Sequence, residues 1–272
     1  MTAMRYPSCL RAVLAGAVLA GAALAVSMSV AALLAPAEAR TLAAIQASGT
    51  IGLCAHPNSL PFASKTADPP GFQIELGRAL AKQLGVSLTP DWVLIAYQIP
   101  RAECDIVLDM VAVREAMDFG IKLTKPYYRG GVALAVPADS PIRSFHDLDA
   151  HTKVGVQTGS LAAMTLNQRH VPISVFGFED DMLAAVAAHE VDAAAVTAIS
   201  TGYFNLKHPD GKLRVVPPDE SDPDLVWNVA VGMRRPDDAL RGAIEKALDT
   251  LGGDGTIAAI YARYGVTLPP PK

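Results

Sequence analysis

Polar and aromatic residues lie in the loops that follow the apolar, strand-like runs of this sequence, where they could contact a small ligand. The first such loop, 56–62, follows the run Thr50–Ala55, is held extended by two prolines, and contains Asn58 and Phe62. Loops at the carboxyl ends of strands line the ligand crevice of open α/β sheets. The chemistry that this pattern predicts is noncovalent binding of a small solute.

A second candidate is the tight turn Gln157–Ser160, which follows the run Val154–Val156 and opens a helix. Free N–H groups at such a helix start can hold a carboxylate or another anion, which would place Thr158 and Gly159 against a ligand. A turn of this kind also commonly does no more than cap its helix. The sequence leaves both roles open.

An aromatic pair, Tyr127 and Tyr128, follows Pro126 just before the apolar run Val132–Val136. Proline fixes the angle at which the chain enters the strand, and two amphipathic rings can face a cleft while they stay partly wet. This arrangement is typical of a hinge between two lobes.

Motifs for catalysis and for metal binding are missing from the sequence. Its six histidines are scattered, and it has no Walker loop, no dinucleotide fingerprint and no Gly-x-Ser-x-Gly elbow. The acidic run Asp219–Asp224 lacks the glycine and the alternating ligands of a calcium loop, and Pro223 interrupts it. We therefore expect a protein that is not an enzyme and holds no metal and no cofactor.

Composition points to a globular, exported protein. The 272 residues are 51% hydrophobic and only 18% charged, with a formal net charge of −4, so no nucleic-acid surface is expected. Arg5 and Arg11 precede an uncharged stretch, 12–37, that ends in the small-x-small site 37–39. This pattern predicts a signal peptide, 1–39, that is cleaved before Arg40 to release the protein into the periplasm without a membrane anchor. An uncleaved anchor is the alternative, because the uncharged stretch is long enough to span a bilayer.

Helical and strand-like patterns alternate along the rest of the chain, which predicts an α/β fold with parallel sheets. Apolar residues recur at helical spacing over Gly71–Leu84, and similar stripes follow residue 238. Two runs, Val132–Val136 and Val226–Met233, are expected to cross between two lobes as hinge strands. The predicted lobes are 40–133 plus 232–272, and 134–231.

Cys54 and Cys104 are the two cysteines left after export, and both belong to predicted neighbouring strands of the first lobe. An oxidising compartment favours a disulfide. One cysteine comes late in its strand and the other early, which separates the pair in parallel strands unless a bend intervenes. The sequence leaves a disulfide and two free thiols equally open.

The segment from Asp105 to Val136 resembles the crossover between lobes of the family 3 periplasmic solute-binding proteins. It has the order of an Asp, an apolar strand, a loop with Arg114, Asp118-Phe119, Pro-Tyr-Tyr and a second strand. The resemblance extends over roughly residues 50 to 268. It implies the two-lobed periplasmic binding protein-like fold of type II, and a cleft that binds a solute for an ABC importer.

Two departures from the amino-acid receptors of that family concern the ligand. The family's loop usually has a Thr before its Arg, whereas this loop lacks the Thr and Arg114 stands one residue closer to Asp118. The family also usually has an Asp at the position of Thr197, which holds the ligand ammonium. A buried ammonium without a carboxylate is costly, so an α-amino acid is a poor ligand on this interpretation.

Several segments also resemble the J-type accessory proteins of methanol oxidation, MxaJ and XoxJ. They include 54–62, 104–107, 125–129, 201–204 and 232–236. This resemblance implies a periplasmic partner of a pyrroloquinoline-quinone methanol or alcohol dehydrogenase, with the quinone and any lanthanide belonging to that partner. An importer receptor for a small polar solute is the alternative. For either role, the predicted cleft residues are Asn58, Phe62, Arg114, Tyr127, Tyr128, Thr158, Gly159, Ser160, Thr197 and Tyr203.

Overall fold

A computed structural model describes residues 40–112, 121–234 and 236–271, all within one unit of the chain. One group of elements, which we call the first lobe, comprises α2 (Leu42–Ser48), β1 (Thr50–Ala55), the hairpin β2 (Asn58–Ser59) and β3 (Ala63–Ser64), α3 (Phe72–Gln83), β4 (Ser87–Trp92), a 3-10 helix (Ala96–Arg101), β5 (Ile106–Val111), β6 (Ile121–Leu123), α8 (Asp238–Gly253) and α9 (Thr256–Ala262).

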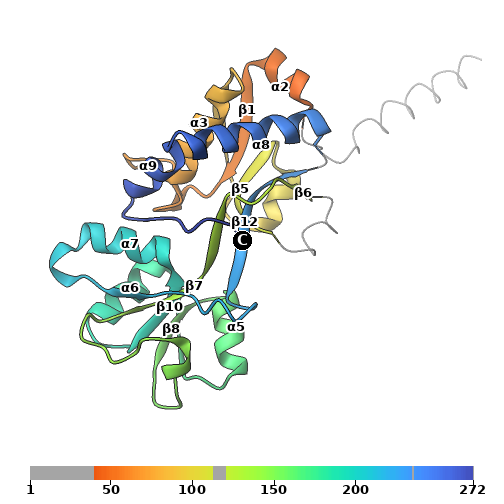
Figure 1. Ribbon diagram of the computed structural model, residues 1–272. Helices are drawn as coiled ribbons and strands as arrows, with labels where there is room; N and C mark the ends of the chain where they lie inside the picture. Colours follow the sequence, from red (N-terminus) through yellow and green to blue (C-terminus); the bar gives the residue numbers. More distant parts are fainter. Residues whose placement is uncertain (1–39, 113–120, 235, 272) are drawn as a thin grey trace, which may run out of the picture. The chain divides into compact units, whose positions relative to one another are not determined.

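The other group, the second lobe, comprises a 3-10 helix (Phe145–Asp147), β8 (Val154–Gln157), α5 (Leu161–Gln168), β9 (Ile173–Phe176), α6 (Glu179–Ala187), β10 (Ala193–Thr197), α7 (Ala198–Lys207), a 3-10 helix (Pro209–Gly211) and β11 (Arg214–Val216). Two long strands, β7 (Tyr128–Val136) and β12 (Val226–Arg234), run between the groups (Figure 1). Neighbouring strands follow the order β4-β1-β5-β12-β7-β10-β8-β9, while β6 pairs with β12 and β11 with β7.

Strand β7 connects the two lobes by changing its partner halfway. Its first residues, 128–131, pair antiparallel with β12, and its later residues, 132–135, pair antiparallel with β10. Strand β12 continues from β7 to an antiparallel pairing with β5. The parallel pairs lie on either side of these strands, with β1 between β4 and β5, and β8 between β10 and β9. The sheet is therefore mixed at the crossover and parallel within each lobe.

Burial patterns explain why these segments are strands. Five of the six residues of β1 are buried, the uninterrupted apolar run of a strand that is covered on both faces. In β10, Ala193 and Ala195 pack into one apolar cluster of the second lobe, and Ala194 and Val196 pack into another. Successive side chains of a strand point to opposite faces, so this sheet separates two small cores.

Helix α7 belongs to the second lobe but also packs on the first. Its Ile199 and Tyr203 join the core cluster of the first lobe, and the ring of Tyr203 lies 6.0 Å from that of Tyr264. A Cβ atom on Gly202 would overlap the backbone of Gly265, so only glycine permits this close approach. The two lobes thus touch directly as well as through the crossover strands.

The sequence prediction of a two-lobed α/β fold is confirmed, with the crossover strands at the expected places. The fold has a few short elements that the prediction missed, namely α2, β2, β3, β6 and β11. The domain boundaries given above, including the signal peptide, stay a prediction. Among the described residues, no helix is both long and apolar enough to cross a membrane.

Candidate ligand cleft

An open cleft of about 780 Å³ lies where the loop after β1, together with Val107 and Leu108 of β5, meets the second lobe. From the first lobe come His56, Asn58 and Phe62, which follow β1 directly. Gly71 fixes the position of this loop, because Phe72 N–H donates to Pro61 and a Cβ atom on Gly71 would overlap the Phe62 carbonyl. Pockets of 300 to 1,000 Å³ or so are typical of small-molecule sites, so the cleft has the size for a solute.

The second lobe contributes the end of β8, the start of α6 and the end of α7. The residues that line the cleft from these places are Gln157, Phe178, Glu179, Asp180, Asp181 and Lys207. Phe178 is 66% exposed, so it offers an apolar surface beside three carboxylates. This side of the cleft can contact both an apolar chain and a charged group.

Glu179 is the least exposed of the three carboxylates, and it is fixed in place by a hydrogen bond. Ser200 Oγ donates to Glu179 Oε2 over 2.5 Å, and Ser200 Oγ lies 3.0 Å from Thr197 Oγ1. Removal from water raises the pKa of the Glu179 carboxyl, the Ser200 hydrogen bond opposes this effect, and the charge of Asp180 adds to it. The cleft wall therefore holds a carboxylate that has lost much of its hydration.

Another carboxylate with little hydration, Asp109, lies behind the first-lobe wall of the cleft. Gln73 Nε2 donates to Asp109 Oδ2 over 2.7 Å, and Tyr127 OH donates to Asp109 Oδ1 over 2.5 Å. Tyr261 OH donates to the same oxygen over 3.3 Å. Burial raises the pKa of Asp109, while the hydrogen bonds from Tyr127 and Gln73 lower it. Gln73 also lines the cleft, so it connects this network to a ligand.

The structure brings only part of the predicted site together. Asn58 and Phe62 line the cleft, whereas Arg114 lies outside the described residues. Tyr128 is 5% exposed and packs in the first-lobe core, and Tyr127 points its hydroxyl at Asp109. The two tyrosines thus face a carboxylate behind the cleft wall and do not line the cleft itself.

The remaining predicted site residues have structural roles, and two of them cap helices. Ser160 and Thr197 cap α5 and α7, accepting hydrogen bonds from Ala163 N–H and Ser200 N–H. The hydroxyl of Thr158 donates to the Phe176 carbonyl. Neither Thr158 nor Gly159 nor Ser160 lines the cleft, and Tyr203 packs in the first-lobe core. Of the two roles left open for the turn at 157–160, the structure shows the capping role.

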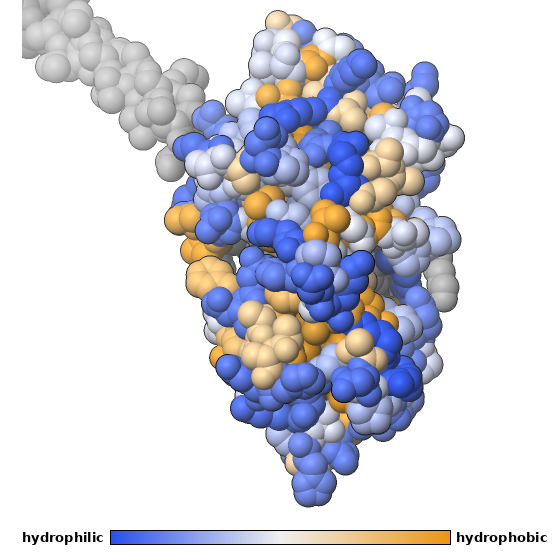
Figure 2. All heavy atoms as spheres, turned by 90° about the vertical axis from the view of Figure 1, so that its left-hand side faces the viewer, coloured by the Kyte–Doolittle hydropathy of each residue, from blue (hydrophilic) through white to orange (hydrophobic). Residues whose placement is uncertain are grey.

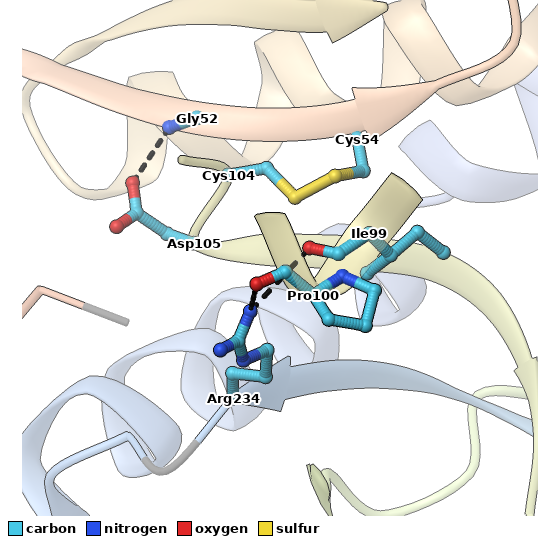
Figure 3. The surroundings of a disulfide bond; sticks show 7 residues. All are labelled: Gly52, Cys54, Ile99, Pro100, Cys104, Asp105 and Arg234. Carbon is cyan, nitrogen blue, oxygen red and sulfur yellow. Dashed lines mark hydrogen bonds between the residues drawn. A yellow bond between two sulfur atoms is a disulfide. The ribbon is translucent and has the colours of Figure 1, made fainter. Parts of the chain in front are cut away.

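Cys54 and Cys104 form a disulfide, with Cα atoms 5.3 Å apart (Figure 3). Cys104 precedes β5, and its Cα lies 3.0 Å from where a Cβ on Gly52 would stand, so the chain bends towards β1 before the strand begins. Asp105 follows, and its Oδ2 accepts from Gly52 N–H over 2.7 Å. The bend brings together two cysteines that a straight parallel pair would keep apart.

Within the described parts of the chain, no group of three or more His, Cys, Asp or Glu side chains is placed to hold a metal ion. The polar groups that face the cleft include amides, hydroxyls and carboxylates next to apolar side chains. Such a lining suits the reversible binding of a polar organic molecule.

Two α/β lobes joined by two crossing strands, with a cleft at the carboxyl ends of parallel strands, define the class of two-lobed periplasmic binding proteins. Residues 41–267 match the bacterial extracellular solute-binding proteins, family 3, and the chain belongs to this family.

Among curated proteins, the chain is similar to the probable amino-acid-binding protein YxeM of Bacillus subtilis, with 29% identity over 76% of this chain and 80% of the relative. It is 26% identical to the lysine/arginine/ornithine-binding periplasmic protein of Escherichia coli, over 75% and 83% of the two chains. A solved structure, the ancestral cationic amino acid solute binding protein AncCDT-1, superposes with a TM-score of 0.71 at 24% identity, over 83% and 99% of the chains, and shows a common fold.

The names of these relatives describe the binding of amino acids and not an enzymatic activity. None of them describes an accessory role in methanol oxidation, so the finer resemblance to the J-type proteins gains no support here.

Proposed function

We propose that this protein is a periplasmic receptor that binds a small polar, amino-acid-like solute in its cleft and presents it to an ABC importer. The observation that carries the proposal is the cleft of about 780 Å³ at the carboxyl ends of parallel strands, lined by polar groups from both lobes. Family membership and the amino-acid-binding relatives support it. No step of this function requires catalysis.

The main objection from the sequence was that Thr197 stands where related receptors have a carboxylate for the ligand ammonium. In the structure, Thr197 caps α7, and Glu179 reaches the same network through Ser200. A carboxylate is therefore present near that position, although it comes from another helix. This arrangement removes the reason for treating an amine ligand as a poor one.

Thermal unfolding of the purified protein with a panel of amino acids, amines and small neutral solutes tests the proposal. A ligand at a hundred times its dissociation constant adds about 2.7 kcal/mol to the free energy of unfolding. This raises Tm by roughly 5 to 10 °C for a chain of this size. Absence of any shift across the panel would contradict a receptor function.

Interaction with a quinoprotein methanol or alcohol dehydrogenase is the second candidate function. The observation that favours it is a group of exposed apolar side chains beside the cleft, since Leu94, Ile95 and Tyr97 are 63%, 58% and 86% exposed. Figure 2 shows one face of the molecule, on which hydrophilic residues predominate and hydrophobic residues gather in places. Capture of the dehydrogenase by the tagged protein, with no solute-induced Tm shift, would reverse the ranking of the two functions.

A further inference from the structure

The second-lobe wall of the cleft carries more negative than positive charge. Among the described residues that line it, Glu179, Asp180 and Asp181 face one cation, Lys207. The balance is three carboxylates against one ammonium, so the electrostatic potential here favours a positively charged ligand.

Glu179 differs from its two neighbours because its surroundings orient it. Asp180 and Asp181 are exposed, whereas Glu179 is half-buried and Ser200 Oγ holds its Oε2. Ser200 is itself positioned by Thr197, whose hydroxyl accepts from Ser200 N–H over 3.2 Å. Within the described part of the chain, no hydrogen bond reaches the other oxygen of Glu179, Oε1. A carboxylate with one fixed oxygen and one free acceptor is suited to bind a donor from a ligand.

We infer that Glu179 binds the charged end of the solute's aliphatic chain, an ammonium or a guanidinium, and that the cleft selects organic cations, such as basic amino acids and diamines, over solutes without net charge. The inference rests on the proposed receptor function and names its ligand class. A cationic group beside Glu179 supplies the charge partner that this poorly hydrated carboxylate lacks among the described residues. The exposed ring of Phe178 and the apolar Phe62 and Leu60 cover the aliphatic part of such a ligand.

Isothermal titration of the purified protein at pH 7 tests this inference with five solutes. L-Lysine, L-arginine and cadaverine carry a net positive charge, while L-glutamine and L-citrulline are zwitterions without net charge. L-Citrulline has the shape of L-arginine without its side-chain charge. We expect at least one cation to bind roughly 10-fold tighter than both neutral solutes. Glu179→Gln keeps the size of the side chain and is expected to weaken that cation roughly 10- to 100-fold, the range for a lost hydrogen bond to a charged group.

Glu190→Gln is the matched control, because Glu190 is exposed in the turn after α6 and does not line the cleft. This control should change the affinity by less than about 2-fold, since exposed charges are screened. Thermal unfolding without solute shows whether each variant folds, and the comparison of L-arginine with L-citrulline needs no variant.

An unchanged affinity of Glu179→Gln for a bound cation would overturn the inference, and so would L-citrulline binding as tightly as L-arginine. Either result leaves the receptor function standing. Failure of all five solutes to bind overturns the inference as well. The receptor function falls only if the wider panel of solutes also produces no Tm shift.

Discussion

The junction of β1 with β5 and the start of α6 each hold a poorly hydrated carboxylate, but the two carboxylates differ in how many hydrogen bonds they accept. At the junction, Asp105 is 1% exposed and accepts hydrogen bonds on both oxygens, from Arg40 on each and from Gly52 N–H on Oδ2. At the start of α6, the Glu179 carboxylate accepts one hydrogen bond from the described residues, donated by Ser200, and lines a cleft. A carboxylate with its acceptor positions filled can only stabilise the fold, whereas one with a free position can also bind a ligand.

Cross-links add to this difference between the two regions. The junction has a disulfide next to Asp105, and Arg234 from β12 donates to the carbonyl groups of Ile99 and Pro100 beside it (Figure 3). The start of α6 has no such connection to the first lobe among the described residues. The cross-links hold the first-lobe wall in place at the junction, whereas α6 supplies the side chains to which we assign ligand recognition in the proposal above.

Loss of the disulfide should have the largest effect on stability. The double variant Cys54→Ala, Cys104→Ala opens a loop of 50 residues, and we expect the free energy of unfolding to fall by about 4 kcal/mol in urea. Adding a reductant should then leave the double variant unchanged while it destabilises the wild type. A loss below about 1 kcal/mol would show that the junction does not depend on its cross-link.

Loss of the Asp105 charge should have the next largest effect. Asp105→Asn removes the bidentate pair with Arg40, and we expect about 2 kcal/mol of destabilisation, less than for a fully buried pair because Arg40 is 36% exposed. Urea unfolding measures the change. Asp249→Asn is the control, since Asp249 and Lys125 are 67% and 60% exposed and solvent screening should leave their pair with no measurable effect on stability. Equal effects of the two variants would contradict the assigned role of Asp105.

Much of the fold could be predicted from the sequence because its elements have strong local signals. The apolar run Thr50–Ala55 and the helical stripe after Gly71 became β1 and α3 within a residue or two. The missed elements are short, and β6 with three residues has too few side chains to show a period. The disulfide could not be predicted because it requires the bend before β5. This bend depends on the close approach of Cys104 to Gly52, which only the three-dimensional structure shows.

The candidate site was harder to predict than the fold. Asn58 and Phe62 were found because they follow a buried parallel strand, and the same rule applied to β9 would have pointed to Glu179. Acidic residues are, however, common in the first turn of a helix because they complement the helix dipole. The sequence of this turn therefore does not mark Glu179 as a ligand-binding residue. Thr197 was predicted to contact the ligand although its hydroxyl caps α7, because the sequence does not show this capping role.

The smallest expected effect is an increase in stability, on replacement of Glu179. Removal from water raises the pKa of Glu179 above its ordinary value of 4.5, so the folded protein binds this proton more tightly than the unfolded chain does. The resulting stability is fully present below pH 4.5 and is lost as the pH rises through the folded-state pKa. As the pH rises through the folded-state pKa, the protein without solute takes on the cost of an ionised, poorly hydrated carboxylate.

Glu179→Gln removes that cost, so this variant should be more stable than the wild type at pH 7 by up to about 1 kcal/mol, whereas both junction variants are less stable. Urea unfolding without solute, repeated from pH 4 to pH 8 or so, should show the advantage of the variant shrinking as the solution becomes more acidic. A saturating cation should reverse the order, because it binds the wild type more tightly and therefore stabilises it more than the variant. If Glu179→Gln were instead destabilised at pH 7 to the same extent as Asp105→Asn, Glu179 would be a structural carboxylate, and the contrast between the two regions would not hold.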